Sequence, residues 1–193
     1  MEKGRLEAFS DGVIAVIITI MVLEFKVPQG QDLNALLTIA PRFLVYVLSF
    51  VNVGIYWNNH HHLVSAASKI DGRVMWANLH LLFWLSLVPF CTNWVGENHL
   101  ASVPTALYGA VLLFSALAFV GLQATLTSLP ANAELAATLG SDVKGKTSAI
   151  AYIAATVFAF VNPWISDVLF VAVAALWFVP ERRIEQRAIA RDA

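Results

Sequence analysis

Polar and ionisable side chains gather at the base of the first apolar segment of this 193-residue chain. Arg5, Ser10 and Asp11 stand just before residues 13–23, a run in which Thr19 is the one polar residue. An ionised group inside a bilayer is costly unless it is paired, so residues of this kind are candidates for function. We expect Asp11 to be held by donors from other segments. The alternative is that it lies hydrated among the lipid head groups.

One face of this first segment forms a stripe. Val16, Thr19, Ile20 and Leu23 follow the spacing i, i+3, i+4, i+7, which places them on one side of a helix, about 140° away from Asp11. Such a stripe is typical of packing against another helix, and Thr19 can bond back to its own backbone. In several copies around an axis it would instead form apolar rings that gate by dewetting and a hydroxyl ring that contacts a cation. Spacing alone does not decide between them.

The donors that Asp11 needs occur near the next two apolar segments. A second span returns to the side where the first began, so residues at the end of span two and the start of span three should lie level with Asp11. These residues are Trp57, His60, His61, His62, Asn78 and His80. Indole, amide and imidazole groups can all donate to a carboxylate. We therefore expect a polar lock that fixes one side of the first helix and leaves its stripe free.

The three consecutive histidines do not predict a metal site. Neighbouring residues on a helix point 100° apart, so His60, His61 and His62 cannot converge on one ion. We expect no metal and no cofactor.

Composition defines the element type that must position these residues. Hydrophobic residues make up 59% of the chain and charged residues 13%, whereas soluble domains have about 45–50% and about 25%. This excludes a soluble domain and a disordered chain. Twelve basic against thirteen acidic residues give no basic surface for nucleic acid. Cys91 is the only cysteine, so no disulfide can form within the chain. An integral membrane protein remains.

About 20 apolar residues cross a bilayer as a helix, and the sequence contains six such segments. We predict an all-α, polytopic membrane protein with one domain, residues 1–193, built as a bundle of six transmembrane helices. The spans are Leu6–Phe25, Leu36–Trp57, Val74–Val95, Val103–Leu126, Thr147–Asn162 and Trp164–Val179. The first could instead be a cleaved signal peptide, but residues 24–28 contain no small-x-small cleavage site. Residues 128–146 are expected to be a loop, and the charged tail after Pro180 a surface helix.

The distribution of basic residues supports six spans. With that count, ten of the twelve Lys and Arg residues fall on the side of the two termini and only two on the other. The ten are Lys3, Arg5, Lys69, Arg73, Lys144, Lys146, Arg182, Arg183, Arg187 and Arg191; the two are Lys26 and Arg42. By the positive-inside rule we expect both termini in the cytoplasm.

The first two segments also resemble a known family. Arg5, Phe9, Ser10 and Asp11 match the Arg-x-x-x-Phe-Ser-Asp signature that opens the first helix of the transmembrane protein 175 family of potassium channels. Residues 53–62 look like the second-helix pattern of the same family. The resemblance implies a six-helix subunit without a P-loop filter, assembled as a homotetramer in the plasma membrane of a prokaryote, with the first helices lining the pore.

The resemblance also implies roles for individual residues. Val16 takes the place of the bulky apolar residue at the main constriction, Thr19 falls on the family's threonine, and Leu23 forms a further ring. Ile20 joins them from the helical projection alone. Arg5 and Asp11 would hold the pore helix through contacts with helices two and three. The permeant ion would be potassium, and the protein would not be an enzyme.

Other functions remain open at this point. A proton-coupled secondary transporter could use Asp11 and the histidine cluster as a proton relay, although transporters usually show broken helices and inverted repeats. An intramembrane enzyme with a histidine-bound metal is disfavoured by the spacing. A non-conducting membrane scaffold is the third alternative.

Overall fold

The computed structural model describes residues 2–98, 101–139 and 143–178. These residues fold almost entirely into helices, as the composition predicts. In chain order they are α1 (Lys3–Leu23), α2 (Leu33–Leu37), α3 (Ala40–Ala66), α4 (Gly72–Ser86), α5 (Val88–Glu97), α6 (Ser102–Thr127), η1 (Pro130–Asn132), α7 (Ala133–Leu139), α8 (Val143–Phe158) and α9 (Pro163–Phe178).

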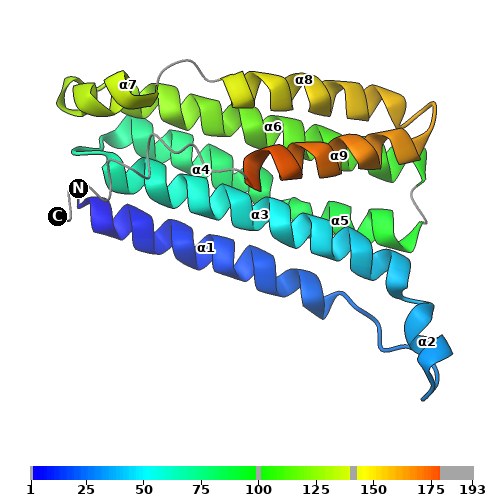
Figure 1. The fold of residues 1–193 in the computed structure, drawn as a ribbon. Coiled ribbons are helices and arrows are strands. Elements are labelled where there is room, and N and C mark those ends of the chain that lie inside the picture. The colour runs from blue at the N-terminus through cyan, green and yellow to red at the C-terminus, as the bar shows by residue number, and fades with distance from the viewer. Residues whose placement is uncertain (1, 99–100, 140–142, 179–193) are drawn as a thin grey trace.

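The long helices run side by side in alternating directions, and α1 lies at one edge of the bundle (Figure 1). It packs against α3, α4 and α5, while α6 contacts α4, α5, α8 and α9. α2 and the segment before it project from the opposite end of the bundle to the N-terminus (Figure 1). The pore helix predicted from the sequence is therefore a peripheral helix of its own subunit.

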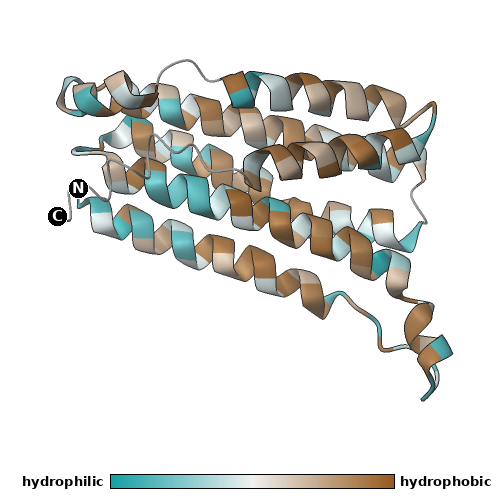
Figure 2. Ribbon diagram, viewed as in Figure 1, coloured by the Kyte–Doolittle hydropathy of each residue, from teal (hydrophilic) through white to brown (hydrophobic). Residues whose placement is uncertain are grey.

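Four segments are long and apolar enough to cross a membrane by length and composition: Lys3–Leu23, Ala40–Ala66, Gly72–Glu97 and Ser102–Thr127. Pro163–Phe178 is a shorter apolar helix. The hydropathy of the residues changes along the bundle axis. Hydrophilic residues gather at the end that holds the N-terminus, and hydrophobic residues make up most of the middle of the helices (Figure 2). A helical membrane protein is thus the class that the fold supports.

The helix that contains most of the second predicted span has other limits. The span is predicted at Leu36–Trp57, and the helix runs from Ala40 to Ala66. Pro41 stands in the first turn, where its missing N–H costs nothing. At the other end the polar run continues the helix, with His60 buried in the bundle. The side-chain amide of Asn59 donates to the Ile55 carbonyl at 2.8 Å.

The third predicted span, Val74–Val95, is divided into α4 and α5 at Leu87. Proline has no N–H to bond the carbonyl four residues earlier, so Pro89 interrupts the helical ladder at this point. α4 begins at the end of the bundle that holds the N-terminus. Its N-cap is Asp71, whose carboxylate accepts from the Val74 N–H at 3.0 Å.

The remaining limits differ by smaller amounts. α1 begins and ends earlier than Leu6–Phe25, and α6 extends Val103–Leu126 by one residue at each end. α8 is shifted toward the N-terminus relative to Thr147–Asn162, and α9 begins at Pro163, one residue before the predicted Trp164. Val179 and the tail after Pro180 lie outside the described residues.

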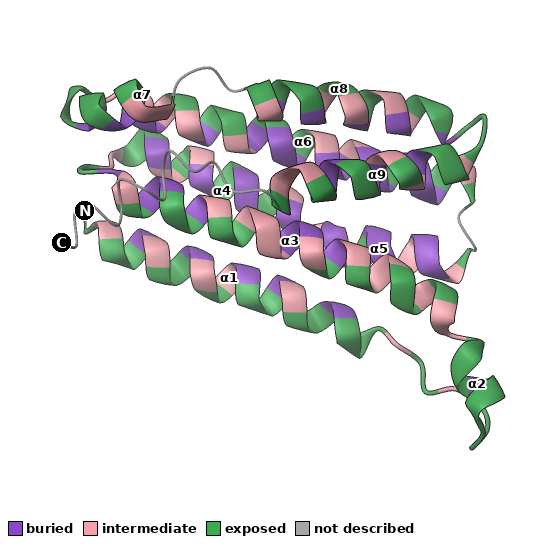
Figure 3. Cartoon of the chain, viewed as in Figure 1, coloured by how far each residue is buried: buried purple, intermediate pink, exposed green. Residues whose placement is uncertain are grey.

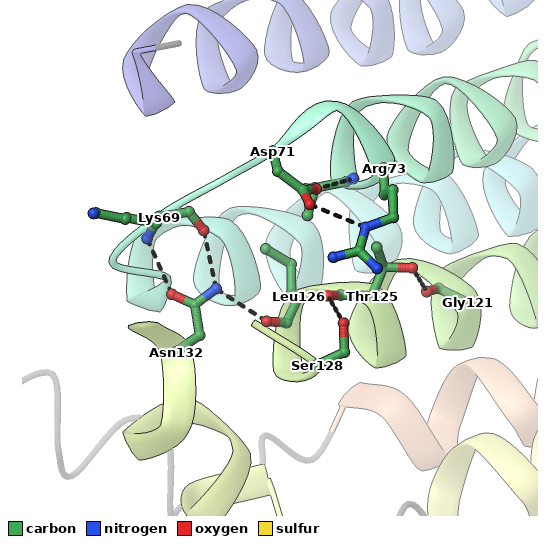
Figure 4. A network of polar contacts seen from close by, with 9 residues as sticks. Lys69, Asp71, Arg73, Gly121, Thr125, Leu126, Ser128 and Asn132 are labelled. Carbon is green, nitrogen blue, oxygen red and sulfur yellow. Dashed lines mark hydrogen bonds and ion pairs between the residues drawn. The ribbon is translucent and has the colours of Figure 1, made fainter. Parts of the chain in front are cut away.

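The expected loop at 128–146 contains η1 and α7, and Asn132 bonds it to the rest of the bundle. Asn132 is 1% exposed. Its Oδ1 accepts from the Ser68 and Lys69 amides at 2.9 and 3.0 Å, and its Nδ2 donates to the Lys69 and Leu126 carbonyls at 2.9 and 3.0 Å (Figure 4). The connection between α3 and α4 is thereby fixed to the end of α6.

Candidate ion pathway and the anchor of its helix

The predicted stripe on α1 lies on the side of the helix that the described residues leave uncovered. Val16 is 60% exposed, Ile20 41% and Leu23 79%, and Thr19 is also exposed. The other side of the helix packs into the bundle through Leu6, Ser10, Ile14, Ile17 and Met21. Figure 3 shows this division along α1, with buried residues toward α3 and exposed residues away from it.

Thr19 satisfies its own donor within α1. Its hydroxyl lies 2.9 Å from the Ala15 carbonyl and 3.1 Å from the Val16 carbonyl. This is the local bond expected of a threonine inside a helix. The hydroxyl oxygen keeps its lone pairs, so it can still act as an acceptor or as a ligand to a cation.

A chain of three polar side chains fixes the buried side of α1. Ser10 Oγ donates to the Leu6 carbonyl at 2.8 Å and accepts from Asn78 Nδ2 at 2.9 Å. Asn78 Oδ1 in turn lies 2.7 Å from His60 Nε2. Because the amide nitrogen of Asn78 donates to Ser10, its oxygen must accept, which makes His60 Nε2 the donor. Ser10, Asn78 and His60 are all buried, so α1, α4 and α3 are joined by a directed chain with every link satisfied.

Asp11 makes a second contact between α1 and α3. Its Oδ1 accepts from Trp57 Nε1 at 2.9 Å. Trp57 is 42% exposed and its ring stacks on His61, with 6.1 Å between centroids. A carboxylate bonded to an indole N–H is a charge-assisted hydrogen bond, stronger than a neutral one.

Three histidines assigned to the lock make no hydrogen bond to Asp11 within the described residues, although His61 stacks on Trp57. His61 and His62 are exposed, and their rings meet each other edge to face with 5.8 Å between centroids. His80 lies on the outer side of α4, where its Nε2 accepts from Trp84 Nε1 at 2.9 Å. The prediction was wrong for these histidines because residues two or one apart on a helix point to different neighbours; His60 and Asn78 face inward, so the others face outward.

The basic contact to α3 comes from Lys3 rather than Arg5. Lys3 Nζ donates to the Ser65 carbonyl at 2.7 Å and to the Ala67 carbonyl at 3.3 Å, at the end of α3. Arg5 and Phe9 are exposed, and Phe9 has 52% of its surface free. Arg5 lies eleven residues before Val16, which places both on nearly the same side of α1. The sequence indicates Lys3 only as one of the basic residues on the cytoplasmic side. Its contact with the end of α3 depends on how α1 and α3 pack, which the sequence pattern does not reveal.

No group of three or more His, Cys, Asp or Glu side chains could hold a metal ion within the parts of the chain that the structure describes. The arrangement instead presents a helix held firmly on one side and uncovered on the other. Fold and site together define a helical membrane protein whose first helix has an exposed, apolar face that carries Thr19.

Comparison with known proteins places the chain in a family. The model of the family described as endosomal/lysosomal potassium channel TMEM175 matches residues 5–89. A protein of Chryseobacterium sp. (strain P1-3), called a potassium channel, is 49% identical over 96% of this chain and 97% of its own length. Another potassium channel, from Streptomyces collinus, is 39% identical over 65% of each protein. This chain belongs to the TMEM175 family.

A solved structure agrees with the fold. The crystal structure of a lysosomal potassium-selective channel TMEM175 homologue from Chamaesiphon minutus has a TM-score of 0.79 and 30% identity, and the match covers 91% of this chain and 96% of that one. Animal relatives are much longer: the chicken endosomal/lysosomal proton channel TMEM175 is 31% identical over 134 residues, which is 27% of its length.

Proposed function

We propose that four copies of this chain form a potassium-permeable cation channel whose pore is lined by the uncovered side of α1. The observation that carries this proposal is the pairing of an uncovered stripe, Val16, Thr19, Ile20 and Leu23, with a buried polar chain on the opposite side of the same helix. Closing four such helices around an axis would cover the stripe. The names of the bacterial relatives as potassium channels support the choice of ion.

In this proposal each subunit crosses the membrane six times, with α4 and α5 together as one crossing and both termini in the cytoplasm. The alternating directions of the long helices support successive crossings of the membrane. The positive-inside distribution of basic residues supports the orientation. The membrane is the plasma membrane of a prokaryote.

The pore would be closed by apolar side chains and tuned by hydroxyl groups. Rings of Val16, Ile20 and Leu23 exclude water when they are narrow, which blocks ions without a plug. The Thr19 ring lies between them and offers oxygen ligands that replace part of the hydration shell of a potassium ion. No cofactor is needed for this mechanism, and potassium is bound only in passing.

Val16→Asn tests the gate. A polar amide ring at this level keeps the constriction wet, so we expect a constitutive current in planar bilayers that is severalfold larger than that of the wild-type protein. Ile17→Asn is not a suitable control because Ile17 is buried, so Val22→Asn, on an exposed side outside the stripe, serves instead and should leave the current unchanged. Equal currents in all three proteins would contradict the gate.

Thr19→Val tests the selectivity ring. The substitution keeps the shape of the side chain and removes the oxygen, so the preference for potassium over sodium should fall. The measurement is the reversal potential under bi-ionic conditions, with Thr125→Val on α6 as the matched control. A reversal potential unchanged in Thr19→Val would exclude this residue from ion selection.

The transporter hypothesis has less support from the site. Asp11 and His60, the residues that a proton relay would use, are bonded to Trp57 and Asn78 in contacts that hold α1. Saturable, stoichiometrically coupled flux in liposomes would nevertheless favour a transporter over a channel.

A further inference from the structure

The two ends of α1 are held by different kinds of contact. At the inner end, where the chain begins, Ser10 is buried and bonded to α4, and Lys3 donates to two carbonyl groups at the end of α3. Toward the outer end, where the helix stops at Leu23, the buried side is apolar. The polar contact made from that half, between Met21 Sδ and Thr92 Oγ1, measures 4.0 Å. The outer half of α1 is therefore held mainly by apolar packing.

One carboxylate joins the chain after α1 to two other helices. Glu97, the last residue of α5, accepts from Lys26 Nζ at 2.9 Å through its Oε1, and Arg42 Nη2 lies 3.5 Å from the same oxygen. Lys26 follows shortly after Leu23, and Arg42 stands in the first turn of α3. This ion pair connects the outer end of α1 with both α3 and α5.

Two further contacts at the outer end are longer or less directional. Asn93 Nδ2 lies 3.4 Å from Glu24 Oε2, which is long for a hydrogen bond. Phe25 meets Tyr46 of α3 edge to face, with 5.3 Å between ring centroids, and aromatic pairs of this kind tolerate a range of separations. Among the described residues between α1 and α2, Lys26 thus makes the short polar contact to another helix.

Glu97 and Arg42 form the fixed side of this contact. A Cβ added to Gly96 would lie 3.2 Å from Arg42 Cγ and 3.4 Å from its Cα, so the end of α5 and the start of α3 touch closely here. The side chain of Arg42 is 30% exposed and that of Glu97 33%, whereas that of Lys26 is 76% exposed. Lys26 is therefore the partner that can leave, while Arg42 stays beside the carboxylate.

The inner anchor and the ion pair belong to different helices. Asn78, which holds Ser10, lies on α4, whereas Glu97 lies on α5, and Pro89 interrupts the helical ladder where the two helices meet. A groove of about 370 Å³ lies between the outer half of α1 and this break, with Ile20 and Pro89 among its lining residues. Within one subunit, the outer half of α1 thus has room to move while the inner anchor stays in place.

We propose that Glu97 is a positioning residue of the pore. Through Lys26 it holds the outer end of α1 against its own subunit and keeps the outer rings, Ile20 and Leu23, apart. α5 packs on the buried side of α1, opposite the stripe, so this contact draws the end of the helix away from the pore axis. The proposal rests on the proposed function, because that function assigns the stripe to the pore.

Glu97→Gln and Lys26→Gln test the contact in planar bilayers. Each subunit loses a contact of the strength of an exposed ion pair, so the potassium current should fall by about twofold or more in either variant. The double variant should show no further loss, because both side chains act through one contact. An effect of charge on the local ion concentration would instead have opposite signs, since one substitution removes a negative charge and the other a positive one.

A reversible cross-link should produce the opposite change. In a cysteine-free background with Cys91→Ala, a short bifunctional methanethiosulfonate joins Lys26→Cys to Glu97→Cys and replaces the reach of the two original side chains. The current of the linked protein should be at least about twofold larger than after reduction with dithiothreitol, which breaks the link. Lys26→Cys alone, treated in the same way, is the matched control and should not respond to dithiothreitol.

The position of the outer end can also be measured without a current. Spin labels at Val27→Cys and Val103→Cys, exposed positions after α1 and at the start of α6, report a distance within one subunit when labelled chains are diluted with unlabelled ones. In the cysteine-free background, Glu97→Gln should broaden this distance distribution. The distribution between Ala8→Cys and Trp76→Cys, exposed positions at the inner end, should stay as it was.

The two proposals fail in different ways, and melting temperatures near the wild-type value establish that each variant is folded. Distance distributions unchanged by Glu97→Gln, or currents that change in opposite directions in Glu97→Gln and Lys26→Gln, would overturn the positioning role. If Val16→Asn opens the channel but neither of these substitutions alters the current, Glu97 does not set the pore and the channel stands. If no potassium current is found but the outer distribution alone broadens, the channel proposal is wrong and the hold of Glu97 on α1 stands.

Discussion

Asn78 is the central residue of the hydrogen-bonded side chains that hold α1, because its amide nitrogen bonds Ser10 and its amide oxygen bonds His60. Asn78→Leu leaves the N–H of His60 buried without an acceptor, and an unpaired buried group of this kind costs about 1–3 kcal/mol. We expect the detergent-solubilised protein to lose stability by that amount in thermal or denaturant unfolding. Asn58→Leu, at an exposed position on α3, should change stability by less than about 0.5 kcal/mol. Equal stability of the two variants would mean that the hydrogen bonds from Ser10 through Asn78 to His60 contribute nothing to the stability of the fold.

One spacing rule was enough to predict which residues share a side of α1, whereas their role in a pore stays a prediction. The i, i+3, i+4, i+7 pattern placed Val16, Thr19 and Leu23 on one side of α1, and the structure leaves that side uncovered. Partners across helices were harder to predict, because proximity along the chain does not define which way a side chain points. For this reason His60 and Asn78, expected as donors to Asp11, bond to each other and to Ser10, and His80 bonds to Trp84.

At the scale of elements, the N-cap of α4 gives a prediction about pH. The Val74 N–H that donates to Asp71, together with Arg73, holds the pKa of this carboxyl below its usual value. A carboxyl whose pKa is lowered on folding stabilises the protein above the pKa of the unfolded chain, and this contribution disappears as the pH falls through the lowered value. Asp71→Asn keeps an acceptor for Val74 and removes the titration.

The stability difference between the wild-type protein and Asp71→Asn should therefore be present in full at pH 6. It should begin to shrink at about pH 4, near the ordinary pKa of aspartate, and disappear as the pH falls through the lowered pKa of Asp71. Melting temperatures measured from pH 6 to pH 3 in a constant detergent provide the test. A difference that stays constant over this range would show that the charge of Asp71 is not involved.

The limits of the elements were predicted less well than their existence. Apolar length indicated where helices occur, but it could not reveal that the polar residues 58–62 continue α3, since that depends on the burial of His60 against α4. Pro89 indicates the break at Leu87, but the apolar character of the whole segment led to the prediction of one continuous helix. Helix α7 and the attachment through Asn132 depend on contacts between distant loops, for which the sequence pattern gave no signal.

For the whole molecule, the sequence predicted a membrane protein and, through the resemblance of two motifs, its family. The shape of one subunit adds the position of α1 at the edge of the bundle, with its apolar stripe turned away from α3 (Figure 1, Figure 3). An exposed apolar face is unremarkable toward lipid, so exposure by itself does not distinguish a lipid-facing helix from a pore-lining one. Thr19 is the stripe residue whose chemistry favours a pore over lipid, because its hydroxyl oxygen can coordinate a cation but makes no favourable polar contact with an acyl chain.

A cysteine ring distinguishes the two environments directly. In a background where Cys91 is replaced by alanine, Val16→Cys would place four thiols around the axis, close enough to bind one cadmium ion, because thiolates are strong ligands for soft metals. We expect micromolar cadmium to block the current of this variant and a thiol chelator to restore it. Ile17→Cys is the matched control, since the adjacent side chain is 4% exposed and faces the inside of its own subunit. Cadmium block in both variants or in neither would mean that α1 does not line the pore with this side, and lipid would then be the neighbour of the stripe.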